Sequence, residues 1–174
     1  MTMQTHWLSD EELTAWVRLV AVVELLPGVL DGQLARDAQL THYEYFAMSQ
    51  LSESPEQTLR TTALAQQTNA TVPRLSHVAR RLEARGLIER FPCPEDARAT
   101  NIRLTAAGMA KVKQAAPGHV ATVRERVLDA LSPTQIQQLS TITGSILAKL
   151  DPDGSMAATW EVPKRLEKRR RPHS

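Results

Sequence analysis

Arginine side chains are concentrated in one stretch of the chain. The positively charged guanidinium group of arginine binds phosphate groups well. Residues 59–113 carry 10 basic and 4 acidic side chains, whereas residues 1–58 carry 2 basic and 9 acidic ones. A basic middle segment beside an acidic one predicts a module that binds a polyanion within a larger scaffold. A solvated basic surface without a partner is the alternative that charge alone leaves open.

The residue types that enzymes use for catalysis form no recognisable arrangement. The five histidines are widely spaced, and no nucleophile stands beside a base in a known motif. Neither a metal-ligand spacing nor a glycine-rich phosphate loop is present. We therefore expect no catalytic residues, no metal site and no cofactor. Cys93 is the only cysteine, so the sequence excludes a disulfide within the chain.

The chain has 174 residues, which is enough for about one domain with an appended arm. Glycine and aromatic residues are scarce, and helix-forming residues recur throughout. We find no apolar run that approaches the roughly 18 residues of a membrane span, and no signal peptide. These features predict a cytoplasmic protein that has no contact with a membrane.

Capping boxes mark two helix starts in the first part of the chain. The box Ser9-Asp10-Glu11-Glu12 precedes apolar residues at helical spacing, which predict a helix over about 10–37. Pro27 either kinks this helix or divides it in two. A second box at 41–44 predicts another helix that ends near residue 53.

The basic segment has the spacing of a helix-turn-helix. A helix over about 61–68 is followed by Asn69, which tolerates the left-handed conformation that such a turn needs. Thr71 caps the next helix, which runs to Arg85 and stops before Gly86. The sequence thus predicts two helices packed across a tight turn.

Two strands are predicted after this pair of helices, over 87–91 and 101–104, with a polar hairpin over 92–100 between them. Residues 58–60 can add a third short strand. The expected fold is mainly α with a small β wing, a winged helix-turn-helix.

Long helices are also predicted at the other end of the chain. One opens at residue 105 and runs to about 131 with a kink at Pro117-Gly118, and another runs from 133 to about 150. We therefore expect a helical region made of 10–37 and 105–150, a winged domain over 41–104, and a basic disordered tail over 155–174.

The spacing of one run resembles the MarR family of bacterial transcriptional regulators. Leu82-Glu83-x-x-Gly86-Leu87-Ile88 is followed by Asp96-x-Arg98 and then by Thr105-x-x-Gly108. The resemblance extends over about residues 10–150. It implies long N- and C-terminal dimerisation helices that interlock in a homodimer, which places two winged domains on successive major grooves of double-stranded DNA.

The resemblance also implies a role for individual residues. The second helix of the helix-turn-helix would lie in the major groove, with Arg74 on guanine and Ser76 on a phosphate. Its other candidate DNA contacts are Thr71, Pro73 and His77. The family often has arginine where His77 stands.

The wing carries the motif Asp96-Ala97-Arg98. By resemblance, Arg98 enters the minor groove and Asp96 supports the turn, although a surface ion pair between them is the alternative. Ala97 departs from the basic residue or glycine usual in the family. The remaining arginines are either phosphate contacts or intramolecular pairs, and the sequence does not separate the two: Arg80, Arg81, Arg90 and Arg103.

Family members commonly bind a small aromatic or acidic effector between the dimer helices and the winged domain. Trp16, His42 and Tyr45 lie in the corresponding segments, although ordinary packing would also account for each. The sequence therefore predicts a nucleoid-associated repressor that binds a pseudo-palindromic operator and is released by an effector. The alternatives are a winged helix that contacts another protein and a non-specific architectural DNA-binding module.

Overall fold

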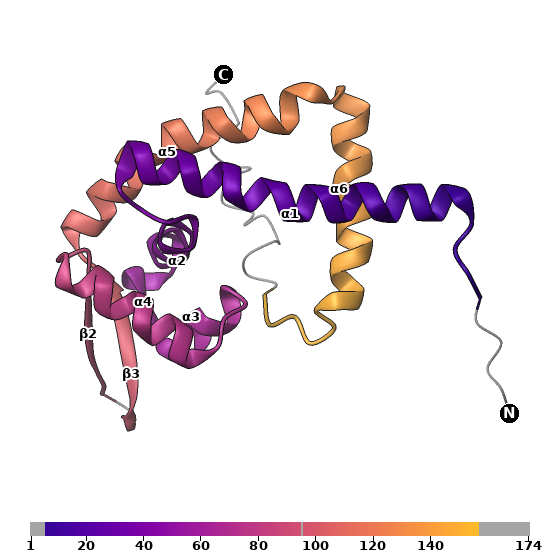
Figure 1. Ribbon diagram of the computed structural model, residues 1–174. Coiled ribbons are helices and arrows are strands. Elements are labelled where there is room, and N and C mark those ends of the chain that lie inside the picture. The colour runs from indigo at the N-terminus through magenta and orange to yellow at the C-terminus, as the bar shows by residue number, and fades with distance from the viewer. Residues whose placement is uncertain (1–5, 95, 157–174) are drawn as a thin grey trace, which may run out of the picture.

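The computed structural model describes residues 6–94 and 96–156. These residues form six α-helices, two short 3-10 turns and a three-stranded antiparallel sheet (Figure 1). The order along the chain is α1 (Asp10–Ala38), α2 (His42–Glu53), η1 (Pro55–Gln57), β1 (Thr58–Arg60), α3 (Thr61–Gln67), α4 (Val72–Ala84), β2 (Ile88–Cys93), β3 (Asp96–Leu104), α5 (Ala106–Arg126), η2 (Leu128–Ala130) and α6 (Pro133–Leu150). The predicted mainly α fold with a small β wing is confirmed.

Both predicted capping boxes are formed. The hydroxyl of Ser9 accepts the N–H of Glu12, whose carboxylate accepts the N–H of Ser9, and Thr41 and Glu44 repeat this exchange at α2. Helix α1 continues through Pro27 without a break. The interpretation as one helix is therefore right, and the division into two is wrong.

The turn between α3 and α4 has the predicted geometry. Asn69 has a φ of 48°, and the next residue, Ala70, donates its N–H to the carbonyl of Ala65 at 2.9 Å. Ala65 is buried where the two helices meet, so its small side chain allows their close approach.

The wing is longer than the sequence predicted. The strands were expected to end at residue 91 and resume at 101, but β2 continues to Cys93 and β3 begins at Asp96. Phe91 pairs with Asn101 and Pro92 with Thr100, before a register shift after Pro92. The sheet order β1-β3-β2 makes β2 an edge strand, where a proline that cannot donate a hydrogen bond is tolerated.

Helix α5 is shorter than predicted. It runs through Pro117 but ends at Arg126 instead of near residue 131. Val127 leaves the helix with φ −130° and ψ −62°, and residues 128–130 form the 3-10 turn that leads to α6. The basic tail over 155–174 lies outside the described residues from 157 onward.

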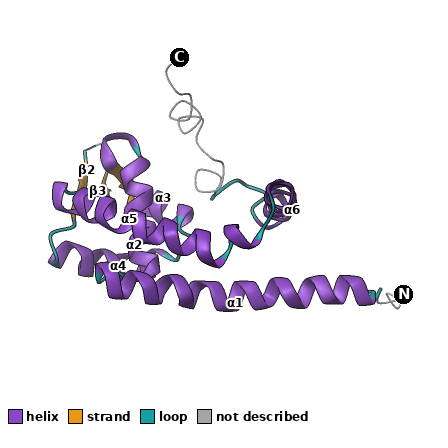
Figure 2. Cartoon of the chain, turned by 90° about the horizontal axis from the view of Figure 1, so that it is seen from above, coloured by secondary structure: helices purple, strands orange, loops and turns teal. Residues whose placement is uncertain are grey.

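The hydrophobic core belongs to the winged part of the molecule and to the helices joined to it. Its most deeply buried apolar side chains come from α1, α2, α3, α4, β3 and the link between α1 and α2: Leu34, Leu40, Met48, Leu51, Leu64, Leu75 and Ile102. Helix α1 is buried only from Leu30 onward, and α6 has no buried residue. Figure 2 shows the N-terminal part of α1 projecting away from the winged part.

The projecting part of α1 is apolar on most of its surface. Its exposed large side chains are Leu13, Trp16, Val17, Leu19, Val20, Val22, Val23, Leu25 and Val29. By length and composition α1 is also long and apolar enough to cross a membrane, which corrects the expectation that no such stretch exists. Only 6% of the most apolar 18-residue window of α1 is buried among the described residues, so this helix presents an exposed apolar surface.

Candidate nucleic-acid interface

Helix α4 presents one buried and one exposed face. Thr71 caps the helix by accepting the N–H of Arg74, and Pro73 lies in the first turn, where no N–H is required. Leu75, Ala79 and Leu82 are buried against the core. At 100° per residue, the opposite face is formed by Pro73, His77, Arg80 and Ala84, all of them exposed.

The side of α4 that faces α2 holds two arginines. The guanidinium of Arg74 lies over the ring of Tyr43, 4.8 Å from its centroid, and the Tyr43 hydroxyl lies 2.9 Å from Oγ1 of Thr68. Arg81 donates to the Glu44 carboxylate at 2.8 Å. The predicted base-reading residue Arg74 is thus in contact with α2.

Glu44 joins three elements. One carboxylate oxygen accepts Arg81, and the other accepts the N–H of Thr41 and lies 3.8 Å from Arg85. Arg85 also donates to the carbonyl of Gln39, the residue that ends α1. Glu44 is 1% exposed, so this buried carboxylate fixes the end of α4 against the corner between α1 and α2.

Two further arginines form ion pairs within the wing region. Arg90 donates two hydrogen bonds to the Glu83 carboxylate, at 2.9 and 2.6 Å, and this contact lowers the pKa of Glu83. Arg103 pairs with Glu89 and stacks on the ring of Phe91. Of the four arginines that the sequence could not assign, Arg81, Arg90 and Arg103 are therefore intramolecular partners.

The tip of the wing is held by Asp96. Its carboxylate accepts the backbone N–H of Arg98 at 3.0 Å, and the Arg98 side chain is exposed. The hydroxyl of Thr61 donates to the carbonyl of Thr100 at 2.8 Å and ties β3 to the start of α3. The wing arginine thus extends from a strand anchored to the helix-turn-helix.

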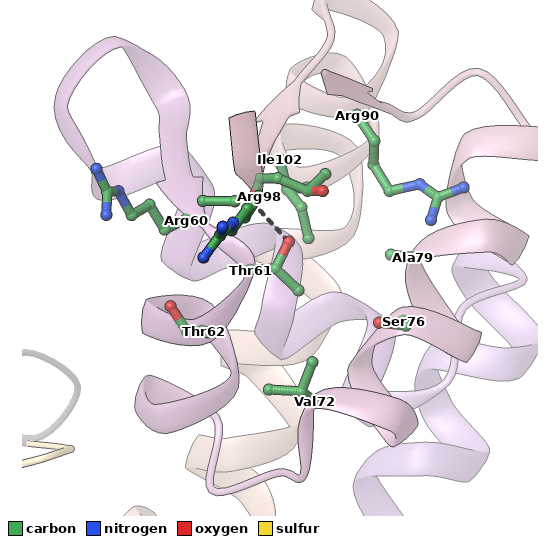
Figure 3. Close-up of a pocket in the computed structure, with 11 residues that line it drawn as sticks. Arg60, Thr61, Thr62, Val72, Ser76, Ala79, Arg90, Arg98 and Ile102 are labelled. Atoms are coloured by element: carbon green, nitrogen blue, oxygen red, sulfur yellow. Dashed lines mark hydrogen bonds between the residues drawn. The ribbon is translucent and has the colours of Figure 1, made fainter. Parts of the chain in front are cut away.

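A cavity of about 220 Å³ separates the wing from α4. Ser76 and Val72 line it from α4, while Thr61 and Arg98 line it from the opposite side, beside Arg60 (Figure 3). The structure therefore brings the predicted residues Ser76 and Arg98 to one groove. Thr71, Pro73 and His77 are exposed on α4, and Arg74 lies on the flank of α4 that faces α2.

Known proteins with a similar sequence and fold identify the family of this chain. The family model described as MarR family matches residues 40–100. The crystal structure of Sco3205, a MarR family transcriptional regulator from Streptomyces coelicolor in complex with DNA, is 38% identical with a TM-score of 0.82, over 87% of this chain and 94% of that one. AbsC, a MarR family transcriptional regulator from the same organism, is 34% identical with a TM-score of 0.80, over 85% and 99% of the two chains. The chain belongs to the MarR family of transcriptional regulators.

More distant members of the MarR family share the fold. A mutant MarR from E. coli, complexed with operator DNA, has a TM-score of 0.68 at 20% identity, over 80% of this chain and 99% of that one. The MarR family consists of transcriptional regulators and not of enzymes. Among the described residues, no group of three or more potential metal ligands occurs.

The predicted effector residues of this MarR-family protein do not all lie together. His42 is stacked with His119 of α5 at a centroid distance of 6.1 Å, and Tyr45 lies 4.7 Å from the same ring. The N–H of His42 donates to Asp31 of α1. Trp16 precedes Asp31 by 15 residues, about 22 Å along α1, and is 56% exposed.

His119 is the residue of this cluster that sequence reasoning missed, because no local pattern links it to His42. Nδ1 of His119 and Oε1 of Gln33 are buried without a hydrogen-bond partner among the described residues. Burial lowers the pKa of His42 against the opposing charge of Asp31. Burial and the neighbouring His42 lower the pKa of His119. The junction of α1, α2 and α5 thus contains polar groups that could bind a small molecule.

Proposed function

We propose that this protein is a sequence-specific repressor that binds a pseudo-palindromic operator as a homodimer and is released by a small-molecule effector. The observation that carries this proposal is the exposed face of α4 next to the groove that Ser76 and Arg98 share. A helix in the major groove and a wing arginine in the minor groove would use these two surfaces together. The proposed place of action is the cytoplasm, at the nucleoid.

The homodimer is supported by the apolar surface of the long helices. Helix α6 adds exposed Ile136, Leu139 and Ile142 to the exposed apolar residues of α1, and one chain alone does not cover them. An exposed apolar surface of this extent marks an interaction site. A second copy would cover it by packing the region 10–37 and 105–150 against its counterpart, with the winged domain 41–104 of each copy left at the DNA.

The DNA contacts proposed for α4 are Thr71, Pro73, Arg74, Ser76 and His77, with Arg98 from the wing and Asp96 as its support. All except Ser76 are exposed. Sco3205 is a MarR family transcriptional regulator whose crystal structure is a complex with DNA, which supports the same partner for this chain.

The proposed effector is a small aromatic or acidic molecule at the junction of α1, α2 and α5. His42, Tyr45 and His119 would supply ring surfaces and imidazole nitrogens there. Trp16 would reach this site only from a second copy, because within one chain it lies far along α1.

The test is binding to duplexes that flank the protein's own gene, at several salt concentrations, beside a scrambled duplex. We expect affinity to fall steeply with salt on both duplexes, with a specific preference of about a thousandfold or more. Arg98→Ala should weaken binding, whereas Arg124→Ala should not, since Arg124 pairs with Asp129 on α5 and η2.

Salt-steep binding without any preference on duplexes from the whole genome would favour an architectural role. Absence of binding at low salt would favour a winged helix that contacts another protein. Sedimentation of the free protein as a monomer at micromolar concentration would contradict the homodimer.

A further inference from the structure

We propose that Arg80, and not Arg74, is the arginine of α4 that reads a base in the operator. This inference rests on the proposed binding of specific DNA by α4 and assigns the specificity within it. It starts from the different surroundings of the four arginines at positions 74, 80, 81 and 85.

Three of these four guanidinium groups are already engaged with the helices behind α4. Arg74 lies on the ring of Tyr43, whose hydroxyl is itself held by Thr68. Arg81 and Arg85 lie at the buried carboxylate of Glu44. Each would have to give up its contact in order to reach a base edge.

Arg80 is the exception. Its one hydrogen bond to a described residue runs from Nε to the carbonyl of Ser76, at 3.4 Å, within its own helix. The two terminal nitrogens of the guanidinium have no partner among the described residues. Arg80 therefore has available the two parallel donors that bind O6 and N7 of guanine.

The position of Arg80 on the helix fits this role. Around the axis of α4, Arg80 lies about 50° from the direction that points directly away from the buried face. This displacement is toward the wing. The contact with the carbonyl of Ser76 directs the guanidinium toward the start of α4, where recognition helices contact base edges. His77 is exposed on the same face, so Arg80 and His77 form one polar surface between Pro73 and Ala84.

The alternative role for Arg80 is a contact with a backbone phosphate. A phosphate contact weakens binding to all sequences alike, while a base contact changes preference at one position. Selection from a pool of duplexes with a randomised centre distinguishes the two. The pool is bound by the wild-type protein, by Arg80→Ala and by Arg74→Ala, and the bound DNA is sequenced.

We expect the wild type to select a pseudo-palindrome that has a guanine at one matched position in each half-site. Arg80→Ala should lose the preference at that position by about 5- to 100-fold and keep the others. Arg74→Ala removes a proposed DNA contact that reads no base, so it should weaken binding to all sequences alike and keep every preference. Because both side chains are exposed, the thermal unfolding of each variant should remain close to that of the wild type, which excludes misfolding as the cause.

The proposal is overturned if Arg80→Ala selects the same sequence as the wild type with uniformly weaker binding. It is also overturned if the guanine preference disappears in Arg74→Ala, which would mean that Arg74 leaves Tyr43 on binding. A wild-type protein that selects no sequence at all would instead overturn the proposed function, and the assignment of Arg80 with it.

Discussion

The ion pair of the buried Glu44 carboxylate with Arg81 predicts how substitutions at these two positions change the free energy of unfolding. This prediction does not depend on DNA binding. Arg81→Ala removes the exposed partner of the pair, since the Arg81 side chain is 51% exposed. It leaves the Glu44 carboxylate in the protein interior with the N–H of Thr41 and the more distant Arg85. Glu44→Gln removes the charge and keeps the shape.

The magnitudes follow from these surroundings. Breaking a buried ion pair from one side costs about 3–5 kcal/mol, and the solvent around Arg81 and the remaining Arg85 reduce this to about 2–3 kcal/mol. Glu44→Gln loses a hydrogen bond to a charged group, about 1.5–3 kcal/mol. In the double variant no uncompensated charge is buried, so its cost should fall short of the sum by about 1–2 kcal/mol.

The assay is urea unfolding followed by circular dichroism at one fixed protein concentration, because association would contribute to stability. Arg80→Ala is the matched control, since this exposed arginine of the same helix makes no hydrogen bond or ion pair outside α4 among the described residues. It should change stability by less than about 0.5 kcal/mol. If the single-variant costs add fully in the double variant, or if Arg81→Ala resembles Arg80→Ala, the buried pair does not hold α4 as argued.

Three further predictions concern pH, close packing and the wing. The pKa values of His42 and His119 are lowered in the folded protein, so just below pH 6.5 the unfolded chain binds more protons than the folded one. The free energy of unfolding should therefore fall as the pH drops through 6.5, and it should be constant above that pH. Urea unfolding between pH 5 and 8 measures this, and a dependence that persists in full in the double variant His42→Phe with His119→Phe would refute the assignment. Gly108→Ala should destabilise the protein by several kcal/mol in thermal unfolding, because a Cβ at this position would lie 2.0 Å from the carbonyl oxygen of Leu87. The control is Ala107→Gly at the exposed neighbouring position, which should cost no more than about 1 kcal/mol. Asp96→Ala releases one exposed N–H at the wing tip, so it should weaken DNA binding several-fold and lower the unfolding midpoint by no more than about 2 °C. Unchanged DNA affinity would show that the turn does not need the Asp96 carboxylate.

Local signals in the sequence predicted the helices well because the responsible contacts are local. The capping boxes at Ser9 and Thr41 each join residues three positions apart, and the left-handed conformation of Asn69 depends on its own side chain. The length of the wing was missed because Pro92 and Thr100 read as a loop until their pairing is seen. The end of α5 was missed because the apolar pattern continues through Val127 while the backbone does not.

The sequence could not predict which arginines form intramolecular contacts, because these contacts join residues far apart in the chain. Arg81 is separated from Glu44 by 37 positions, and nothing in either local pattern indicates the pairing. Arg74 and Arg80 have the same charge and similar positions on one helix, yet only one of them has an aromatic ring beneath it. Which arginine remains free depends on packing between α2 and α4, and no residue of α4 encodes it alone.

The continuity of α1 through Pro27 has a consequence for the spacing of two DNA sites. The helix has 29 residues and is about 43 Å long, and its last turns are packed into the winged part while its first turns project. In the proposed dimer, a tilt of α1 by about 5° would displace one end against the other by about 4 Å, close to the 3.4 Å rise of one base pair. In that dimer, an unbroken rod with a tilt of this size would hold the distance between the two half-sites to within about one base-pair step. A break at residue 27 would have left that distance to a hinge.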